Sequence, residues 1–327
     1  MTGGDVNRDL EPCIAVVGMH RSGTSATAGL LIGLGLAGPR EDDLVAGDSS
    51  NERGHWESHE VQLCNARLLA AVGATTYAPP PFTEDWSAVA DYESVKARAV
   101  SWFSATYAGV PIVMKDPRLC LTMPFWRTTV PAPMGAILVL RDPMHVARSL
   151  QARDGVPILL GLALWDRYIR SASHGLSGLP TIVVEYNSMI EDRADATRAV
   201  TQFLEQMGVH PKAGASDDPA LSLDPGLRHQ SDRNFQYGDL DSVQREVLEV
   251  LTERLGPHAS WQPPDLPPPP AWVDDALRLR RDYARAAREL HWIRASRTYK
   301  MASSLWRLTG RGPTTLGQAG PEEENVL

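Results

Sequence analysis

Short apolar runs alternate with amphipathic segments along the first two thirds of the chain. Four runs rich in aliphatic residues predict buried strands, and they are CIAVVG from Cys13, PIVMK from Pro111, GAILVL from Gly135 and PTIVVE from Pro180. Helical patterns lie between them, at 22–36, 61–72, 92–107, 145–153 and 160–173. Strands that alternate with helices predict an α/β fold, a parallel β-sheet flanked by helices on both faces. Ligand-binding residues are then expected beyond the carboxyl ends of the strands.

The pattern changes towards the C-terminus. Residues 241–255 predict one more amphipathic helix, which completes a main domain over 13–258, and residues 259–270 contain QPPDLPPPP and predict a stiff, extended linker. From 271 to 310 a basic helical extension is expected, because apolar residues follow the alternating spacing of four and three of a coiled coil. This apolar seam consists of Trp272, Ala276, Leu279, Tyr283, Ala286, Leu290 and Ile293. Residues 1–12 and 311–327 are expected to be disordered.

Composition and charge exclude several classes of protein. The chain has 327 residues, 43% of them hydrophobic, and a net charge of −8, which favours a globular protein and argues against a nucleic-acid partner. The three cysteines are far apart, so they predict neither a zinc site nor a disulfide framework. The apolar run at 29–38 is too short to cross a bilayer, and the start of the chain has no apolar core of a signal peptide. These features predict a cytoplasmic location.

The C-terminal extension has the opposite charge to the rest of the chain. Between Ala271 and Arg311 there are ten basic residues against four acidic ones, a net charge of +6. A basic helix with an apolar seam predicts either peripheral contact with an anionic membrane, at its inner face, or a homodimer. Packing on the acidic main domain is the simpler alternative.

The first strand ends in GMHRSGTS, from Gly18 to Ser25, which nearly matches the phosphate-binding loop G-x-x-x-x-G-K-[ST]. Thr24 stands where that motif has lysine, and the nearest cation is Arg21. Free N–H groups at the start of a helix attract anions, so the loop predicts an anion site. The alternative is an ordinary turn between a strand and a helix.

A second candidate site follows the strand GAILVL. Arg141 comes directly after this strand, and Ser149 follows eight residues later, two turns into the next predicted helix. The pair predicts a binding site for a second phosphate. The alternative is a surface ion pair between Arg141 and Asp142, with Pro143 starting the helix.

These two motifs, with VMKDPRLC between them and NERGHWES and PFW nearby, resemble bacterial sulfotransferases that use 3′-phosphoadenosine 5′-phosphosulfate (PAPS). The resemblance covers about 13–208 and implies a P-loop NTPase-like sulfotransferase fold, with PAPS as the sulfuryl donor and no metal. It implies that Arg141 and Ser149 bind the 3′-phosphate. The residues that it assigns to the 5′-phosphosulfate are Arg21, Ser22, Gly23, Thr24 and Ser25.

The resemblance also implies a reaction, the transfer of a sulfuryl group to a hydroxyl of a small-molecule or glycan acceptor such as a carbohydrate or glycolipid. Positive charge is needed at the leaving oxygen, and Arg21 and Lys115 are the candidates. Lys115 lies at the end of a predicted strand, so topology places it at the same edge of the sheet. The alternative for Lys115 is a surface pair with Asp116.

A general base must accept the proton of the hydroxyl. Glu57 is the leading candidate, because NERGHWES places it at a predicted helix start, and His20 and His55 are alternatives. Glu57 could instead stabilise the first turn of that helix as a capping carboxylate.

A late loop, LRHQSDRNF, offers Arg228 as a further contact for the donor. The R-K-G signature of cytosolic sulfotransferases is missing there. Two other functions remain open at this point, a P-loop kinase acting on a small molecule and a non-catalytic nucleotide-binding protein.

Overall fold

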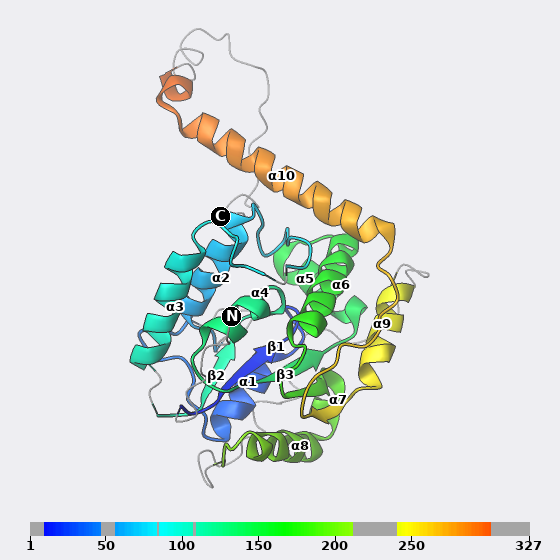
Figure 1. Cartoon of the computed structure of the whole chain (residues 1–327). Coiled ribbons are helices and arrows are strands. Elements are labelled where there is room, and N and C mark those ends of the chain that lie inside the picture. Colours follow the sequence, from blue (N-terminus) through cyan, green and yellow to red (C-terminus); the bar gives the residue numbers. More distant parts are fainter. Residues whose placement is uncertain (1–9, 47–55, 84, 107–108, 212–240, 302–327) are drawn as a thin grey trace.

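The computed structural model describes residues 10–46, 56–83, 85–106, 109–211 and 241–301. Within them lies one five-stranded sheet of order β2-β1-β3-β4-β5, in which β1 to β4 are parallel and β5 is antiparallel (Figure 1). The strands are β1 (Cys13–Val17), β2 (Ile112–Lys115), β3 (Met134–Leu140), β4 (Thr181–Glu185) and β5 (Gly256–His258). The four strands predicted from apolar runs are therefore confirmed, and the short edge strand β5 was not predicted.

Helices fill the intervals between the strands. Those anticipated from the sequence are α1 (Thr24–Gly33), α2 (His59–Ala71), α3 (Tyr92–Thr106), α5 (Pro143–Asp154), α6 (Ile158–Gly175), α9 (Ser242–Thr252) and α10 (Ala271–Ala295). Three more were not anticipated, α4 (Leu119–Thr129), α7 (Tyr186–Glu191) and α8 (Arg193–Gln206).

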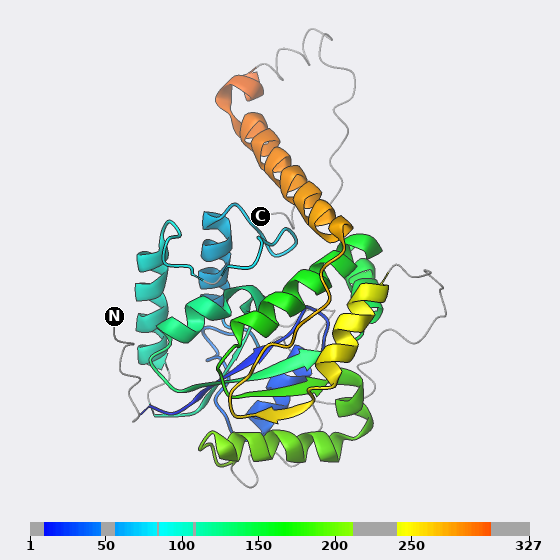
Figure 2. The same ribbon diagram turned by 45° about the vertical axis from the view of Figure 1, so that its right-hand side comes forward.

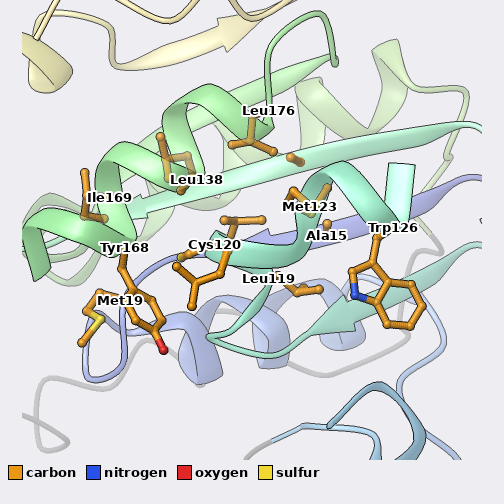
Figure 3. Close-up of a cluster of buried hydrophobic side chains, with 14 of the residues drawn as sticks. Ala15, Met19, Leu119, Cys120, Met123, Trp126, Leu138, Tyr168, Ile169 and Leu176 are labelled. Carbon is orange, nitrogen blue, oxygen red and sulfur yellow. The ribbon is translucent and has the colours of Figure 1, made fainter. Parts of the chain in front are cut away.

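Both faces of the sheet are covered, as an α/β fold requires. Along β1, Cys13, Ala15 and Val17 belong to the hydrophobic core that contains α4 and α6. Ile14 and Val16 belong to the core on the opposite face, with α1 and α8. Figure 2 shows the two layers of helices, and Figure 3 shows side chains of α4 and α6 packed over the first face. The predicted fold class, a mostly parallel sheet between helices with a helix following it, is confirmed.

The strand order places the ends of β1, β2 and β3 side by side. Strand β1 pairs with β2 on one side and with β3 on the other, and Val16 lies opposite Lys115 in the register. After β1 the chain forms β2 on one side of that strand, and it later forms β3 on the other side. This change of direction opens a crevice at the carboxyl edge of the sheet, where ligands bind.

The proline-rich segment is extended and is attached to the main domain at its start. Trp261 is only 1% exposed, and its indole N–H donates to the carbonyl oxygen of Ser173 at 2.8 Å. Its backbone N–H donates to Leu179 O at 2.8 Å, and Leu266 packs against the same core. The chain is therefore held against α6 before α10 begins.

Helix α10 packs on the main domain only through its first half. Val273, Leu277 and Ala284 are buried, whereas Leu279 and Ile293 of the predicted seam are 71% and 55% exposed. The second half projects beyond the domain in both views (Figures 1 and 2). Helix α10 therefore packs on the main domain through part of its length. Contact of this helix with a membrane or with a second copy of the chain stays a prediction.

Helix α10 covers only part of the predicted extension. Helix α10 ends at Ala295, and residues 302–310 of the predicted extension lie outside the described residues. Among the described helices, none combines the length and the apolar character that crossing a bilayer demands.

We expect Trp261→Ala to lower the free energy of unfolding by about 3–5 kcal/mol, because a large buried side chain is lost. Trp292→Ala on α10 is the matched control, since Trp292 is 76% exposed and should change the value by less than about 0.5 kcal/mol. Urea unfolding measures both. An unchanged value for Trp261→Ala would show that the proline-rich segment is not part of the folded domain.

Candidate functional site

The loop between β1 and α1 passes closely between its neighbours, and two glycines make this possible. A Cβ on Gly18 would lie 2.8 Å from the carbonyl oxygen of Val139 in β3. A Cβ on Gly23 would lie 2.0 Å from the ring of Tyr186, and the φ of Gly23 is +90°. Arg21 also has a positive φ, 66°, which is uncommon for a residue with a side chain.

The same loop forms the N-terminal end of α1. The first N–H groups of a helix have no carbonyl partner within the helix, and the helix dipole adds partial positive charge there. Thr24 and Ser22 are buried in this turn. Among the described residues, the Ser22 hydroxyl has no hydrogen-bond partner. A buried, unpaired hydroxyl at the start of a helix fits a ligand that is rich in acceptor oxygens.

Arg21, Arg141 and Ser149 meet beside the loop. The Arg21 Nε donates to Ser149 Oγ at 2.9 Å, and Arg141 Nη1 donates to the carbonyl oxygen of Arg21 at 2.6 Å. The Arg141 guanidinium also lies over the Tyr186 ring, 4.8 Å from its centre. The structure therefore brings together the residues that the sequence assigned to two phosphate groups.

The neighbouring Asp142 has a separate role. Its side chain accepts a hydrogen bond from His145 N at 2.8 Å and caps α5, which begins at Pro143. Pro143 starts the helix as expected. Asp142 thus stabilises the start of α5 while Arg141 extends towards the glycine loop, so the two residues act on different elements.

Lys115 enters the site from the end of β2. Its Nζ donates to Ser25 Oγ at 3.1 Å and forms an ion pair with Glu57 Oε1. Lys115 is 4% exposed, so the alternative of a surface pair with Asp116 is wrong. Thr24 occupies the lysine position of the phosphate-binding loop, and a lysine from the adjacent strand reaches the first turn of α1 instead.

Asp116 binds a different cation. Its two carboxylate oxygens accept hydrogen bonds from Arg118, from Nε at 2.9 Å and from Nη2 at 2.7 Å. The backbone N–H of Arg118 donates to the same carboxylate at 2.7 Å. Asp116 therefore does not orient Lys115. It holds Arg118, a cation that the sequence analysis did not assign.

Glu57 lies two residues before α2, close to the predicted helix start, but it is not the residue that caps the helix. Ser58 is the cap, because its hydroxyl accepts from Val61 N at 3.1 Å. The Glu57 carboxylate accepts from Gln62 Nε2 at 2.5 Å as well as pairing with Lys115. The alternative of a capping carboxylate is therefore wrong.

The environment of Glu57 favours its ionised form. Burial alone would raise its pKa, but the charge of Lys115 and the hydrogen bonds from Lys115 and Gln62 outweigh burial. The net result is a pKa below the ordinary value of 4.5. Glu57 is a carboxylate at neutral pH and is already bound to a cation.

His20 lies in the loop between two aromatic rings. Its ring stacks on Tyr77 with 6.1 Å between centres and meets Tyr168 edge-on at 5.7 Å. Within the described part of the chain, His20 Nε2 is buried and has no hydrogen-bond partner. Burial, followed by the charges of Arg153, Arg118, Lys115 and Arg21, lowers the pKa of His20 well below 6.5. His20 is therefore neutral at physiological pH and can accept a proton.

Sequence reasoning missed two of the residues close to His20, Arg153 and Asp154. Tyr77 donates its hydroxyl to Asp154 Oδ2 at 2.7 Å, and Arg153 forms an ion pair with Asp154 at 2.6 Å. Arg153 follows Ser149 by one helical turn, so the spacing alone could have placed both on one face of α5. Tyr77 comes from a loop with no periodic pattern.

Two predicted site residues, Arg228 and His55, lie outside the described residues. In the described ranges, no three His, Cys, Asp or Glu side chains gather in a way that would hold a metal ion.

Comparisons with known proteins find distant similarities to solved structures. No family model matches the chain, and no curated protein matches it. Among solved structures it is similar to the sulfotransferase domain of the Synechococcus PCC 7002 olefin synthase, with 15% identity, a TM-score of 0.37 and coverage of 86% of this chain and 98% of that one. The sulfotransferase domain from the curacin biosynthetic pathway gives 14% identity, a TM-score of 0.37 and coverage of 84% and 98%. Similarity this distant leaves the function to be argued from the residues of the site.

We expect Gly23→Ala to weaken binding of 3′-phosphoadenosine 5′-phosphate at least tenfold, because the new methyl group would displace the loop from Tyr186. Gly73→Ala is the matched control. Gly73 has a similar φ of +71° but no atom within 4 Å of the added Cβ, so only about 1–2 kcal/mol of backbone strain is expected. Calorimetric titration measures the loss of binding, and urea unfolding measures the loss of stability from backbone strain. Equal binding by both variants would contradict this role of the loop.

The buried ion pair predicts a double-mutant result. Glu57→Gln and Lys115→Met should each lower the free energy of unfolding by about 3–5 kcal/mol, because each leaves one buried charge unpaired. The double variant should lose less than the sum of the two. Additive losses, measured by urea unfolding, would show that the pair is not coupled.

The same pair also predicts a pH dependence. The pKa of Glu57 is lowered by folding, so its stabilising contribution is complete above 4.5 and is lost as the pH falls through the lower folded value. The difference in the free energy of unfolding between the wild type and Glu57→Gln should therefore shrink as the pH falls below 4.5. A gap that stays constant down to acid unfolding would contradict the lowered pKa.

Proposed function

We propose that this protein transfers a sulfuryl group from PAPS to a hydroxyl of an acceptor molecule. The observation that carries the proposal is the convergence of cations on the glycine loop from three elements, with Arg21 in the loop, Lys115 from β2 and Arg141 from β3. Burial first, and then repulsion from Arg153 and Arg141, lowers the pKa of Arg21. Charges crowded in this way favour an anion with several negative groups.

The arrangement suits a donor with two separate anionic ends. The N–H groups of α1, with Lys115 at Ser25, form one binding region. Arg141 and Ser149, which both contact Arg21, form the other. PAPS supplies a 5′-phosphosulfate and a 3′-phosphate. Its 5′-phosphate is the leaving group of the transfer. The buried Ser22 hydroxyl, unpaired within the described residues, adds a donor for the first region.

Lys115 and the loop N–H groups would stabilise the leaving phosphate. The sulfuryl sulfur forms a bond to the acceptor oxygen as its bond to the bridging oxygen breaks, so negative charge grows on that oxygen. Lys115 is held in place from two sides, by Ser25 and by Glu57. Glu57 is therefore assigned as the residue that positions Lys115, instead of the base first expected.

His20 is the better candidate for the general base. Its Nε2 can accept the hydroxyl proton of the acceptor, because the ring is neutral and this atom is unpaired among the described residues. Several of the causes that lower its pKa are cations, Arg153, Lys115 and Arg21 among them. A bound anionic donor would offset their charges and make His20 a stronger base when the donor is present.

The kinase alternative is disfavoured by the acidic residues at the strand ends. A kinase needs a carboxylate there to help hold magnesium. Asp116 after β2 is bound to Arg118, Asp142 after β3 caps α5, and Glu185 at the end of β4 caps α7. Consumption of ATP that depends on magnesium would revive this alternative. Binding of PAPS without transfer would favour the non-catalytic one.

The acceptor supplies the hydroxyl that takes up the sulfuryl group. The family resemblance favours a carbohydrate, a glycolipid or a related metabolite. Its hydroxyl must reach His20 Nε2, which Tyr77 and Tyr168 flank. Because Nε2 is buried, the acceptor hydroxyl reaches it only when a neighbouring side chain moves aside.

The direct test is incubation with radiolabelled PAPS and a metabolite extract, followed by a search for a product heavier by one sulfuryl group. We expect His20→Ala to lower the rate at saturating donor by about 10²–10⁴-fold without loss of donor binding. His174→Ala is the control, because His174 is exposed and lies against Phe82 instead of the loop.

The pH profile gives a second measurement. The lowered pKa of His20 predicts a rate that is constant around neutral pH and falls only as His20 becomes protonated at lower pH. A wild-type rate for His20→Ala would assign the base elsewhere. Failure to detect any sulfated product, together with failure to bind PAPS, would contradict the proposed function.

A further inference from the structure

A large groove lies next to the site, between α10 and the junction of α5 and α6. Its volume is about 950 Å³, near the upper end of the range of about 300–1,000 Å³ for small-molecule sites. One wall comes from α10, and the opposite wall comes from the turn after α5 and the start of α6. Figure 1 shows α10 crossing beside these two helices.

The first half of the predicted apolar seam on α10 lines this groove. Trp272, Ala276, Leu279 and Tyr283 all line it. They are the first four positions of the seam that predicts a coiled coil. Leu279 is 71% exposed and Tyr283 is 55% exposed, so much apolar surface is left open to water along this wall. Such a surface normally has a partner.

The α10 wall is attached to the domain by polar contacts. Arg281 Nη1 donates to Pro79 O at 2.7 Å, and Arg167 Nη1 donates to Pro80 O at 2.6 Å. Arg167 also pairs with Asp274 of α10 at 2.5 Å. These bonds hold the wall against the loop that carries Tyr77. The groove is therefore formed without help from an occupant.

One end of the groove is polar and is formed by residues close to His20, which does not itself line the groove. Tyr77 and Arg153 line the groove, and the ring of Tyr77 stacks on His20. Arg153 Nη2 donates to the Tyr77 hydroxyl at 3.3 Å. The rest of the lining is largely apolar and includes Leu160 and Val156. The groove thus combines an apolar body with a polar end beside the general base.

We infer that this groove binds the acceptor, and that the acceptor is an amphiphile whose apolar part lies along α10 while its hydroxyl reaches His20. The inference rests on the proposed function and adds the chemical class of the acceptor to it. A free sugar would leave the apolar wall in water, whereas an apolar chain would cover it and gain binding energy from each buried methylene group. A hydroxyl at the polar end would lie at Tyr77, the residue whose ring stacks on the group that accepts its proton.

A series of alkyl β-glucosides tests the inference, because methyl, butyl, hexyl and octyl glucosides share the same hydroxyls and differ only in chain length. Below the micelle concentration, calorimetric titration of the full chain should show an affinity at least tenfold higher for the octyl than for the methyl compound. Transfer from PAPS to each glucoside is measured in parallel, and its KM should fall in the same order, from the methyl to the octyl compound.

Leu279→Asp should remove this dependence on chain length, and it should fold because the side chain is exposed. Leu290→Asp is the matched control, since Leu290 lies on the same helix at 48% exposure and does not line the groove. Light scattering measures the solution mass of each variant, so that pairing with a second copy is detected.

Two results would overturn the inference while leaving the proposed function intact. One is transfer that is independent of chain length or is unchanged in Leu279→Asp. The other is a wild-type dimer that Leu279→Asp converts to a monomer, because a second copy would then cover the wall. Octyl glucoside that binds with the expected order but is never sulfated would support the groove and count against the proposed function.

Discussion

Repulsion between positive charges at the carboxyl edge of the sheet is the constraint on which the site depends. Arg21, Lys115 and Arg141 come from three elements that the strand order places side by side. Folding brings them together although each is at least partly withdrawn from water. Burial first, and the neighbouring positive charges second, lower the pKa values of Arg21 and His20. Carboxylates offset part of this charge, Glu57 at Lys115 and Asp154 at Arg153. An anionic ligand would offset the rest.

The fold was largely predictable because buried parallel strands have a clear signature in sequence. Each of the four predicted strands is a short apolar run, and all four are paired in one sheet. Helix α4 was missed because it contains Pro124, which lacks the N–H needed inside a helix. Its neighbours Phe125 and Trp126 are buried, so packing outweighs the lost hydrogen bond.

The site was predictable only where its residues follow a strand. Arg141 and Lys115 could be placed at one edge from topology alone. The pairing of Lys115 with Glu57, 58 residues away, and the stacking of Tyr77 on His20 depend on loops whose paths no spacing reveals. The interpretation of the seam on α10 changed for a similar reason, because only the structure shows that its first half faces a groove.

The central claim is that the glycine loop and Arg141 together bind a nucleotide with two separate anionic ends. Calorimetric titration with 3′-phosphoadenosine 5′-phosphate, AMP and ATP with magnesium tests it most directly. The account predicts that the bisphosphate binds at least tenfold more tightly than AMP, and that Arg141→Ala removes this preference. Equal binding of the bisphosphate and AMP, with tighter binding of ATP in the presence of magnesium, would contradict it.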